Sequence, residues 1–225
     1  MSDLIDLLER KQLIWQGRYS QPAPEVVSSG YPLLDEKLAG GLPKTGVVSI
    51  QSSMGIGELR ILMNILLSKS RLVVFINPPG FLCAEFLYHQ GIDLNNVLVI
   101  YPRRKNEALW AAEQCLKSGA CSAVLLWQHA FEIHQVKRLQ IACDEGDCLQ
   151  FLMRGCARTE ASLPVSLSMH LAPHSQGLDV SITKRKGGWP IPAFTLDVST
   201  YWPVFCYAKA SNVIPFPTTH HRQTV

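Results

Sequence analysis

The chain has 225 residues, of which 47% are apolar and 17% are charged, and its formal net charge is +3. This length supports one sizeable core with small appendages, and the mild charge does not by itself argue for nucleic-acid binding. No window reaches the roughly 18 continuous apolar residues of a membrane span, so we expect no membrane partner.

The N-terminal segment, residues 1–18, is predicted to form a helix. Its first six residues are partly acidic and unlike a signal peptide, so we expect a cytoplasmic protein. Asp3 can cap the helix and Gly17 can end it. Leu4, Leu8 and Trp15 fall near one face, which we expect to bind a partner; folding back onto the chain's own core is the alternative. A tether rich in Ser, Gln and Pro follows over residues 19–27.

The core is predicted over residues 28–206, where continuous apolar strands alternate with amphipathic helices. Strands are expected at 47–50, 72–76, 97–100, 123–127 and 149–153, with helices at 57–68, 81–90, 106–118 and 131–145. This alternation is typical of an α/β fold whose mostly parallel sheet is covered by helices on both faces. Three later strands, at 165–171, 177–183 and 193–198, follow one another through turns, so the sheet is expected to finish in antiparallel fashion.

The C-terminal tail, residues 207–225, is expected to be disordered apart from an apolar island around Ile214 and Phe216. That island is predicted either to bind a partner or to lie against the chain's own sheet, since exposed apolar groups favour burial. No metal site is expected, because the seven Cys form no Cys-x-x-Cys pair and the His residues lack ligand spacing.

The segment "QSSMGIGELR", residues 51–60, lies between a predicted strand and a predicted helix, where a phosphate-binding loop would lie. Such a loop reads Gly-x-x-x-x-Gly-Lys-Ser/Thr. Here Ser52 replaces the first glycine and Gly57 keeps the second. Glu58 stands at the lysine position and Leu59 at the hydroxyl position. The sequence thus keeps the predicted strand, loop and helix of a nucleotide site but lacks the lysine and the hydroxyl that bind phosphate and Mg²⁺.

Three segments in order resemble RecA-type recombinases over roughly residues 28–200. They are "SSGYPLLDEKLAGGLPKTGVVSI", "GIDLNNVLVIYPRRKNEALWAAEQCLKSGACSAVLLW" and "DVSITKRKGGWPIPAFTLDV". The resemblance implies a RecA-like P-loop core. It also places the Walker B aspartate of RecA on Trp127 and the water-activating glutamate on Pro79.

Phosphoryl transfer depends on positioned charge, and this chain has lost the cations and gained an anion. A carboxylate at Glu58 would repel a triphosphate by about 4 kcal/mol at a separation near 4 Å. We therefore expect no ATP binding, no cofactor and no enzymatic activity.

Within this superfamily the chain resembles ImuA, the RecA-like accessory proteins of bacterial mutagenic translesion synthesis. The marks are "LLERKQLIWQGR", "GIGELR" and "KRKGG". The resemblance implies a non-catalytic protein of the SOS response to DNA damage, with ImuB and an error-prone C-family DNA polymerase as partners. RecA is expected as a further partner, because Lys184 and Lys186 match a lysine pair of RecA. The stretch from "GIGELR" to "FLMR" also resembles SulA, the division inhibitor that binds FtsZ. SulA proteins are shorter and lack the N-terminal helix, which favours ImuA.

Two basic clusters, Arg103–Lys105 and Lys184–Lys186, stand out in a weakly charged chain. Direct DNA binding is expected to be weak or absent, because basic clusters without interleaved aromatic residues are weak evidence of it and one RecA DNA loop is missing before the 131–145 helix. Lys184 and Lys186 match the RecA lysine pair that touches the ATP of the adjacent subunit. The alternative is that they are surface lysines of a turn.

Overall fold

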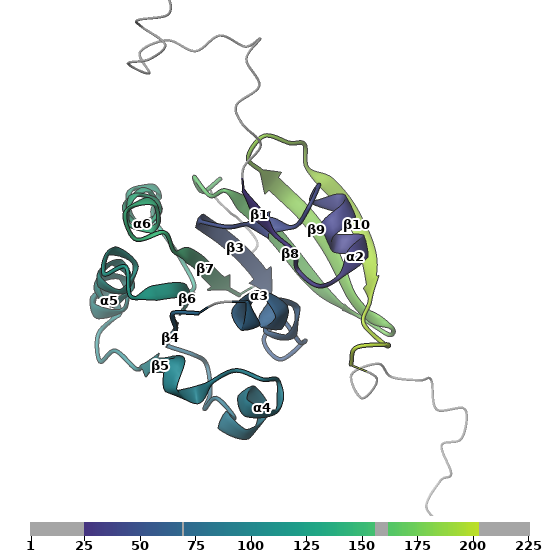
Figure 1. Cartoon of the computed structure of the whole chain (residues 1–225). Coiled ribbons are helices and arrows are strands. Elements are labelled where there is room, and N and C mark those ends of the chain that lie inside the picture. Colours follow the sequence, from purple (N-terminus) through teal and green to yellow (C-terminus); the bar gives the residue numbers. More distant parts are fainter. Residues whose placement is uncertain (1–24, 69, 156–161, 203–225) are drawn as a thin grey trace, which may run out of the picture.

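An eight-stranded sheet in the order β10-β9-β8-β3-β7-β6-β4-β5 forms the centre of the molecule (Figure 1). The computed structural model describes residues 25–68, 70–155 and 162–202. The predicted N-terminal helix, with Leu4, Leu8 and Trp15, and the predicted tail, with Ile214 and Phe216, lie outside the described residues.

The sheet is parallel in its larger part. Its parallel strands are β3 (Gly46–Ser52), β4 (Leu72–Ile76), β5 (Val97–Ile100), β6 (Cys121–Trp127), β7 (Leu149–Arg154) and β8 (Leu167–His174). The hairpin strands β9 (Gly177–Arg185) and β10 (Ile191–Asp197) then complete it in antiparallel fashion. The predicted fold class, a mostly parallel α/β sheet that ends in antiparallel strands, is confirmed.

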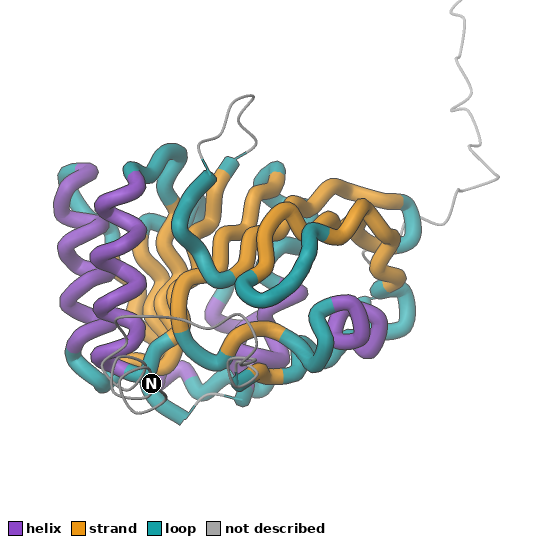
Figure 2. The backbone as a smooth tube through the Cα atoms, turned by 90° about the horizontal axis from the view of Figure 1, so that it is seen from above, coloured by secondary structure: helices purple, strands orange, loops and turns teal. Residues whose placement is uncertain are grey.

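Helices cover both faces of the sheet. The two long helices, α5 (Lys105–Lys117) and α6 (Ile133–Gly146), lie side by side over one face (Figure 2). The other face carries shorter elements, which are α2 (Pro32–Lys37), the 3₁₀ turn η1 (Arg60–Leu62), α3 (Met63–Leu67) and α4 (Ala84–His89). A further 3₁₀ turn, η2 (Leu94–Asn96), leads into β5.

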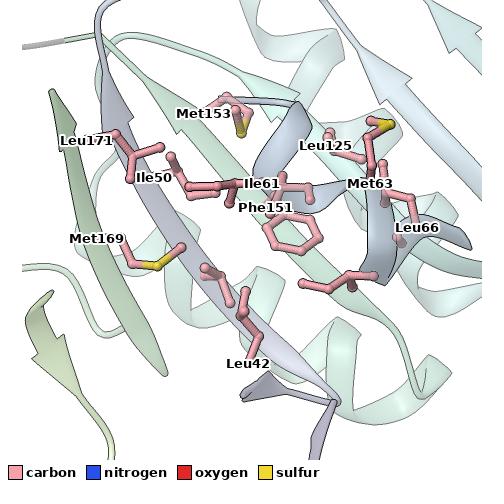
Figure 3. Packing of buried hydrophobic residues seen from close by; sticks show 14 of the residues in the cluster. Leu42, Ile50, Ile61, Met63, Leu66, Leu125, Phe151, Met153, Met169 and Leu171 are labelled. Atoms are coloured by element: carbon pink, nitrogen blue, oxygen red, sulfur yellow. The ribbon is translucent and has the colours of Figure 1, made fainter. Parts of the chain in front are cut away.

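Alternation along the strands divides the core into two clusters. On β6, Leu125 and Trp127 belong to the cluster under α3, whereas Val124 and Leu126 belong to the cluster under α5 and α6. Figure 3 shows the first cluster, in which Phe151 of β7 lies between strand and helix side chains. A strand buried on both faces is apolar at every position, which is why these strands are visible as continuous apolar runs.

Some elements differ from the sequence prediction. The helix predicted at 57–68 begins only with η1 at Arg60, because Gly55 and Gly57 adopt φ of 81° and 99° and keep the preceding residues in a loop. A small antiparallel sheet of two strands, β1 (Val26–Val27) and β2 (Leu42–Pro43) with α2 between them in the chain, was not predicted, since two-residue strands carry no periodic signal. Its first strand falls on residues assigned to the tether.

None of the described helices has the length and apolarity needed to cross a membrane. Within residues 25–68, 70–155 and 162–202, no cluster of three His, Cys, Asp or Glu side chains is arranged to hold a metal ion.

Candidate functional site

The segment that matches a phosphate-binding loop follows β3 at the carboxyl edge of the parallel strands. Ser52, the last residue of β3, is buried and pairs with Leu171 of β8. The chain then turns through Gly55 and Gly57, both in the left-handed region that favours glycine. The loop geometry therefore depends on glycine at these two positions, one of which is the glycine retained from the motif.

Glu58, at the lysine position of the motif, lies inside this loop. The residue is only 8% exposed, and its Oε1 accepts a hydrogen bond of 3.3 Å from the backbone N–H of Gly55. Backbone N–H groups of a glycine-rich turn are the donors that cradle a phosphate in a P-loop. In this chain one such donor binds the protein's own carboxylate.

Leu59, at the hydroxyl position, is partly buried against the core cluster under α3. An aliphatic side chain offers no oxygen for Mg²⁺, which prefers oxygen ligands. The two residues that directly follow Gly57 thus contact the loop and the core.

Arg60, the first cation after the loop, contacts two aromatic rings, which also contact each other with centroids 6.1 Å apart. Its guanidinium carbon is 5.3 Å from the ring centroid of Phe86 and 4.6 Å from that of Trp202. Trp202 Nε1 donates to Tyr31 Oη at 2.9 Å, and Tyr31 Oη donates to the carbonyl of Arg60 at 3.2 Å. Burial lowers the pKa of Arg60 and raises the pKa of Tyr31. We call Tyr31, Arg60, Phe86 and Trp202 the aromatic box.

The aromatic box leaves almost no free volume beside the loop. The cavity bordered by Tyr31, Gly57, Arg60 and Trp202 measures about 10 Å³, roughly the space of one water molecule. This box was not predicted from the sequence. Arg60 is adjacent to the motif, but the aromatic residues come from distant segments and form no sequence pattern with it.

Trp127 and Pro79, the positions assigned to the Walker B aspartate and the catalytic glutamate, lie at the same edge as Ser52. Trp127 ends β6, is 8% exposed, and stacks on Phe75 with ring centroids 6.3 Å apart. Pro79 is exposed in the turn after β4, where Asn77 Nδ2 donates to the carbonyl of Trp127 at 3.1 Å. The parallel strands thus bring these three positions to one edge, but none of them presents an acid.

Lys184 and Lys186 lie at the opposite edge, beside the amino ends of the parallel strands, because β9 runs antiparallel to β8. Lys184 Nζ donates to the carbonyl of Leu163 at 2.6 Å, whereas Lys186 is exposed in the turn after β9. Arg185, between them, donates to the carbonyl of Lys37 at 3.0 Å. The two lysines are therefore not equivalent: one is bound to the chain itself and the other faces solvent.

The other basic cluster caps α5. The backbone N–H groups of Arg103 and Arg104 each donate to Glu107 Oε2 at 3.1 Å. Tyr101, two residues earlier, contacts Phe81 edge to face at 6.3 Å, and Phe81 is 98% exposed. These aromatic neighbours were not predicted from the sequence, since Phe81 lies in the loop after β4.

No protein-family model matches the chain. RecA of Nostoc punctiforme is 29% identical over 126 residues, which are 55% of this chain and 34% of that protein. RecA of Mycoplasma genitalium is 28% identical over 149 residues, 63% of this chain and 44% of that protein. The described core is RecA-like. The chain spans less than half the length of these two relatives.

Among solved structures, the crystal structure of SulA from Pseudomonas aeruginosa is similar at 24% identity and a TM-score of 0.43. The match covers 49% of this chain and 98% of that chain. The core of this chain is a RecA-like α/β sheet. In its phosphate-binding-type loop, Glu58 replaces the lysine of the motif and Leu59 replaces the serine or threonine.

Proposed function

We propose that this protein is a non-catalytic, RecA-like accessory protein of SOS-induced, error-prone translesion synthesis, comparable to ImuA. It acts through contacts with ImuB, the error-prone C-family polymerase and RecA. The observation that supports this proposal is the carboxylate of Glu58, bound to the loop's own Gly55 N–H where a RecA-like protein would bind phosphate.

The proposed absence of catalysis rests on the side chains at the four chemical positions. Glu58 brings negative charge, Leu59 and Trp127 are packed into the core, and Pro79 carries no acid. Catalysis of phosphoryl transfer relies on cations and Mg²⁺ that neutralise developing charge. A RecA-like core without these groups retains its surfaces, so its proposed role is to bind other proteins.

Docking on a RecA filament is the part of the proposal that the sheet geometry supports. A filament interface joins the nucleotide of one subunit to the lysine pair of the next. This chain offers lysines at one edge and a loop occupied by Glu58 at the other, so it can join one end of a filament and block further addition. Lys186, which is exposed, is the main proposed phosphate contact.

The contacts with the polymerase partners are assigned to segments outside the described residues. Leu4, Leu8 and Trp15 form the proposed contact face of the helix that the sequence predicts at the N-terminus. Ile214 and Phe216 form the proposed contact of the tail. Direct DNA contact has no assigned part in this function.

Replacing Lys186 by alanine is expected to weaken binding to RecA filaments on single-stranded DNA roughly tenfold or more, as for one charge-assisted hydrogen bond. Lys184→Ala is expected to have a smaller effect, because Lys184 Nζ already binds the carbonyl of Leu163. Binding is measured by light scattering or surface immobilisation with a non-hydrolysable ATP analogue. Lys44→Ala, which removes an exposed lysine between β2 and β3, is the control.

Equal binding by wild type and Lys186→Ala, or equal binding to nucleotide-free RecA, would contradict the docking model. The translesion role is tested separately, by the frequency of damage-induced mutations in cells without the gene. An unchanged mutation frequency, together with cell filamentation when the protein is overproduced, would instead support a SulA-like role with FtsZ as the partner.

A further inference from the structure

The outer side of α6 carries a continuous exposed stripe. Residues at helical spacings of three, four and seven share one face of a helix. On α6 this face consists of His134, Lys137, Arg138, Ile141, Asp144 and Glu145, all of which are exposed. The inner side, which includes Val136, Leu139 and Ala142, is buried against the sheet. We call the exposed set the α6 stripe.

The α6 stripe has an apolar centre and charges of opposite sign on either side. Ile141 is 56% exposed, although it is a large aliphatic residue. Lys137 and Arg138 lie one turn before it, and Asp144 and Glu145 lie one turn after it. Lys137 and Glu145 are each four residues from Ile141, and Arg138 and Asp144 are each three residues from it.

Because the charges are arranged symmetrically about Ile141, the α6 stripe is complementary in charge to the same stripe on a second copy of the chain. In an antiparallel pair of α6 helices related by a two-fold axis at Ile141, Lys137 faces Glu145 of the partner and Arg138 faces Asp144 of the partner. Each pair then occurs twice, and the two Ile141 side chains meet at the axis. A self-complementary patch of this kind is what a two-fold symmetric dimer requires.

Side chains of α5 lie next to the α6 stripe and contact it. Glu113, with a side chain only 11% exposed, forms ion pairs with Arg138 and Lys117. The ion pair with Glu113 therefore positions Arg138. A guanidinium has five N–H donors, so Arg138 can also donate to a carboxylate of a second chain. Beside the stripe, a groove of about 420 Å³ is bordered by Trp110, which is 63% exposed.

From this geometry we infer that the protein forms a two-fold symmetric homodimer through antiparallel contact of the α6 stripes. The contact removes Ile141 from water and brings Trp110 to the rim of the interface. Two helices bury less surface than a standard protein interface of about 1,600 Å². The dimer is accordingly weak, and its exposed ion pairs make it weaker at high salt.

Charge reversal gives a direct test, read by sedimentation equilibrium of the full-length chain. Lys137→Glu places two glutamates opposite each other at each pair, and Glu145→Lys places two lysines opposite each other. Each variant alone is expected to dimerise at least tenfold more weakly than wild type. The double variant K137E/E145K restores both pairs with reversed sign and is expected to dimerise like wild type.

Mixing the two single variants provides the matched control. In a mixed dimer the introduced glutamate of one chain faces the introduced lysine of the other, and the remaining native Lys137 faces the remaining native Glu145. The mixture is therefore expected to form dimers that neither variant forms alone. Glu36→Lys, which reverses an exposed charge on α2 at the other face of the sheet, is expected to leave the dimer unchanged. A monomeric wild type at all concentrations would overturn the inference. So would single variants that dimerise as well as wild type, or a mixture that remains monomeric.

Discussion

Replacing Trp127 by alanine is expected to lower the free energy of unfolding by about 3–5 kcal/mol. The indole is 8% exposed and stacks on Phe75, in the cluster that also holds Phe151 and Met153. Truncation removes this packing and leaves a cavity at the end of β6. The hydrogen bond from Asn77 Nδ2 goes to the backbone carbonyl of residue 127, so alanine can keep it. Urea unfolding followed by circular dichroism measures the loss.

Trp127→Phe is the control, since a phenyl ring keeps most of the contact with Phe75 and should cost clearly less. Trp127→Asp restores the residue type of RecA but buries a carboxylate without a partner, so it should destabilise more than alanine does. An alanine variant as stable as wild type would show that Trp127 does not serve the core. Its position would then have to be explained by an interaction at the surface.

Replacing Gly146 by alanine is the second large expected effect, a loss of about 2–3 kcal/mol. Gly146 ends α6, and a Cβ built there would lie 1.8 Å from the carbonyl oxygen of Leu116 near the end of α5. That contact is with backbone, so α5 and α6 would have to separate. The sign is informative, because helix propensity alone would favour alanine over glycine by roughly 1 kcal/mol.

Gly80→Ala is the matched control, since a Cβ at Gly80 meets no atom within 4 Å. We expect its stability to stay close to that of wild type. A Gly146→Ala variant that is more stable than wild type would mean that α5 and α6 pack less closely than described. It would also weaken the inference that Glu113 of α5 positions Arg138 in the α6 stripe.

The central strands β4 and β6 were predictable because they are buried on both faces. The runs at 72–76 and 97–100 became β4 and β5 at the predicted bounds, since nearly every residue in them is apolar. The two-stranded β1–β2 sheet and α2 were not predicted, as short elements depend on contacts made elsewhere in the chain. The change from parallel to antiparallel pairing was visible in the turns after residue 160.

For the candidate site, the sequence predicted only which residues of the phosphate-binding motif are replaced. Glu58 and Leu59 stand out against a fixed motif, so their departure is visible in the sequence. That Glu58 accepts a hydrogen bond from Gly55, and that Arg60 contacts Phe86 and Trp202, depends on how the loop and distant segments fold. Likewise, the pattern at 184–186 shows two lysines, but not that Lys184 binds the carbonyl of Leu163.

The central claim is that Glu58 occupies the loop that a nucleotide would need. Calorimetric titration of the full-length protein with Mg²⁺-ATP tests it most directly, with unfolding measured in parallel. A ligand at one hundred times its dissociation constant stabilises the native state by about 2.7 kcal/mol, so binding would be evident in both measurements. We predict no saturable heat and no stabilisation at millimolar ATP. Saturable binding that Gly57→Asp abolishes would contradict the account.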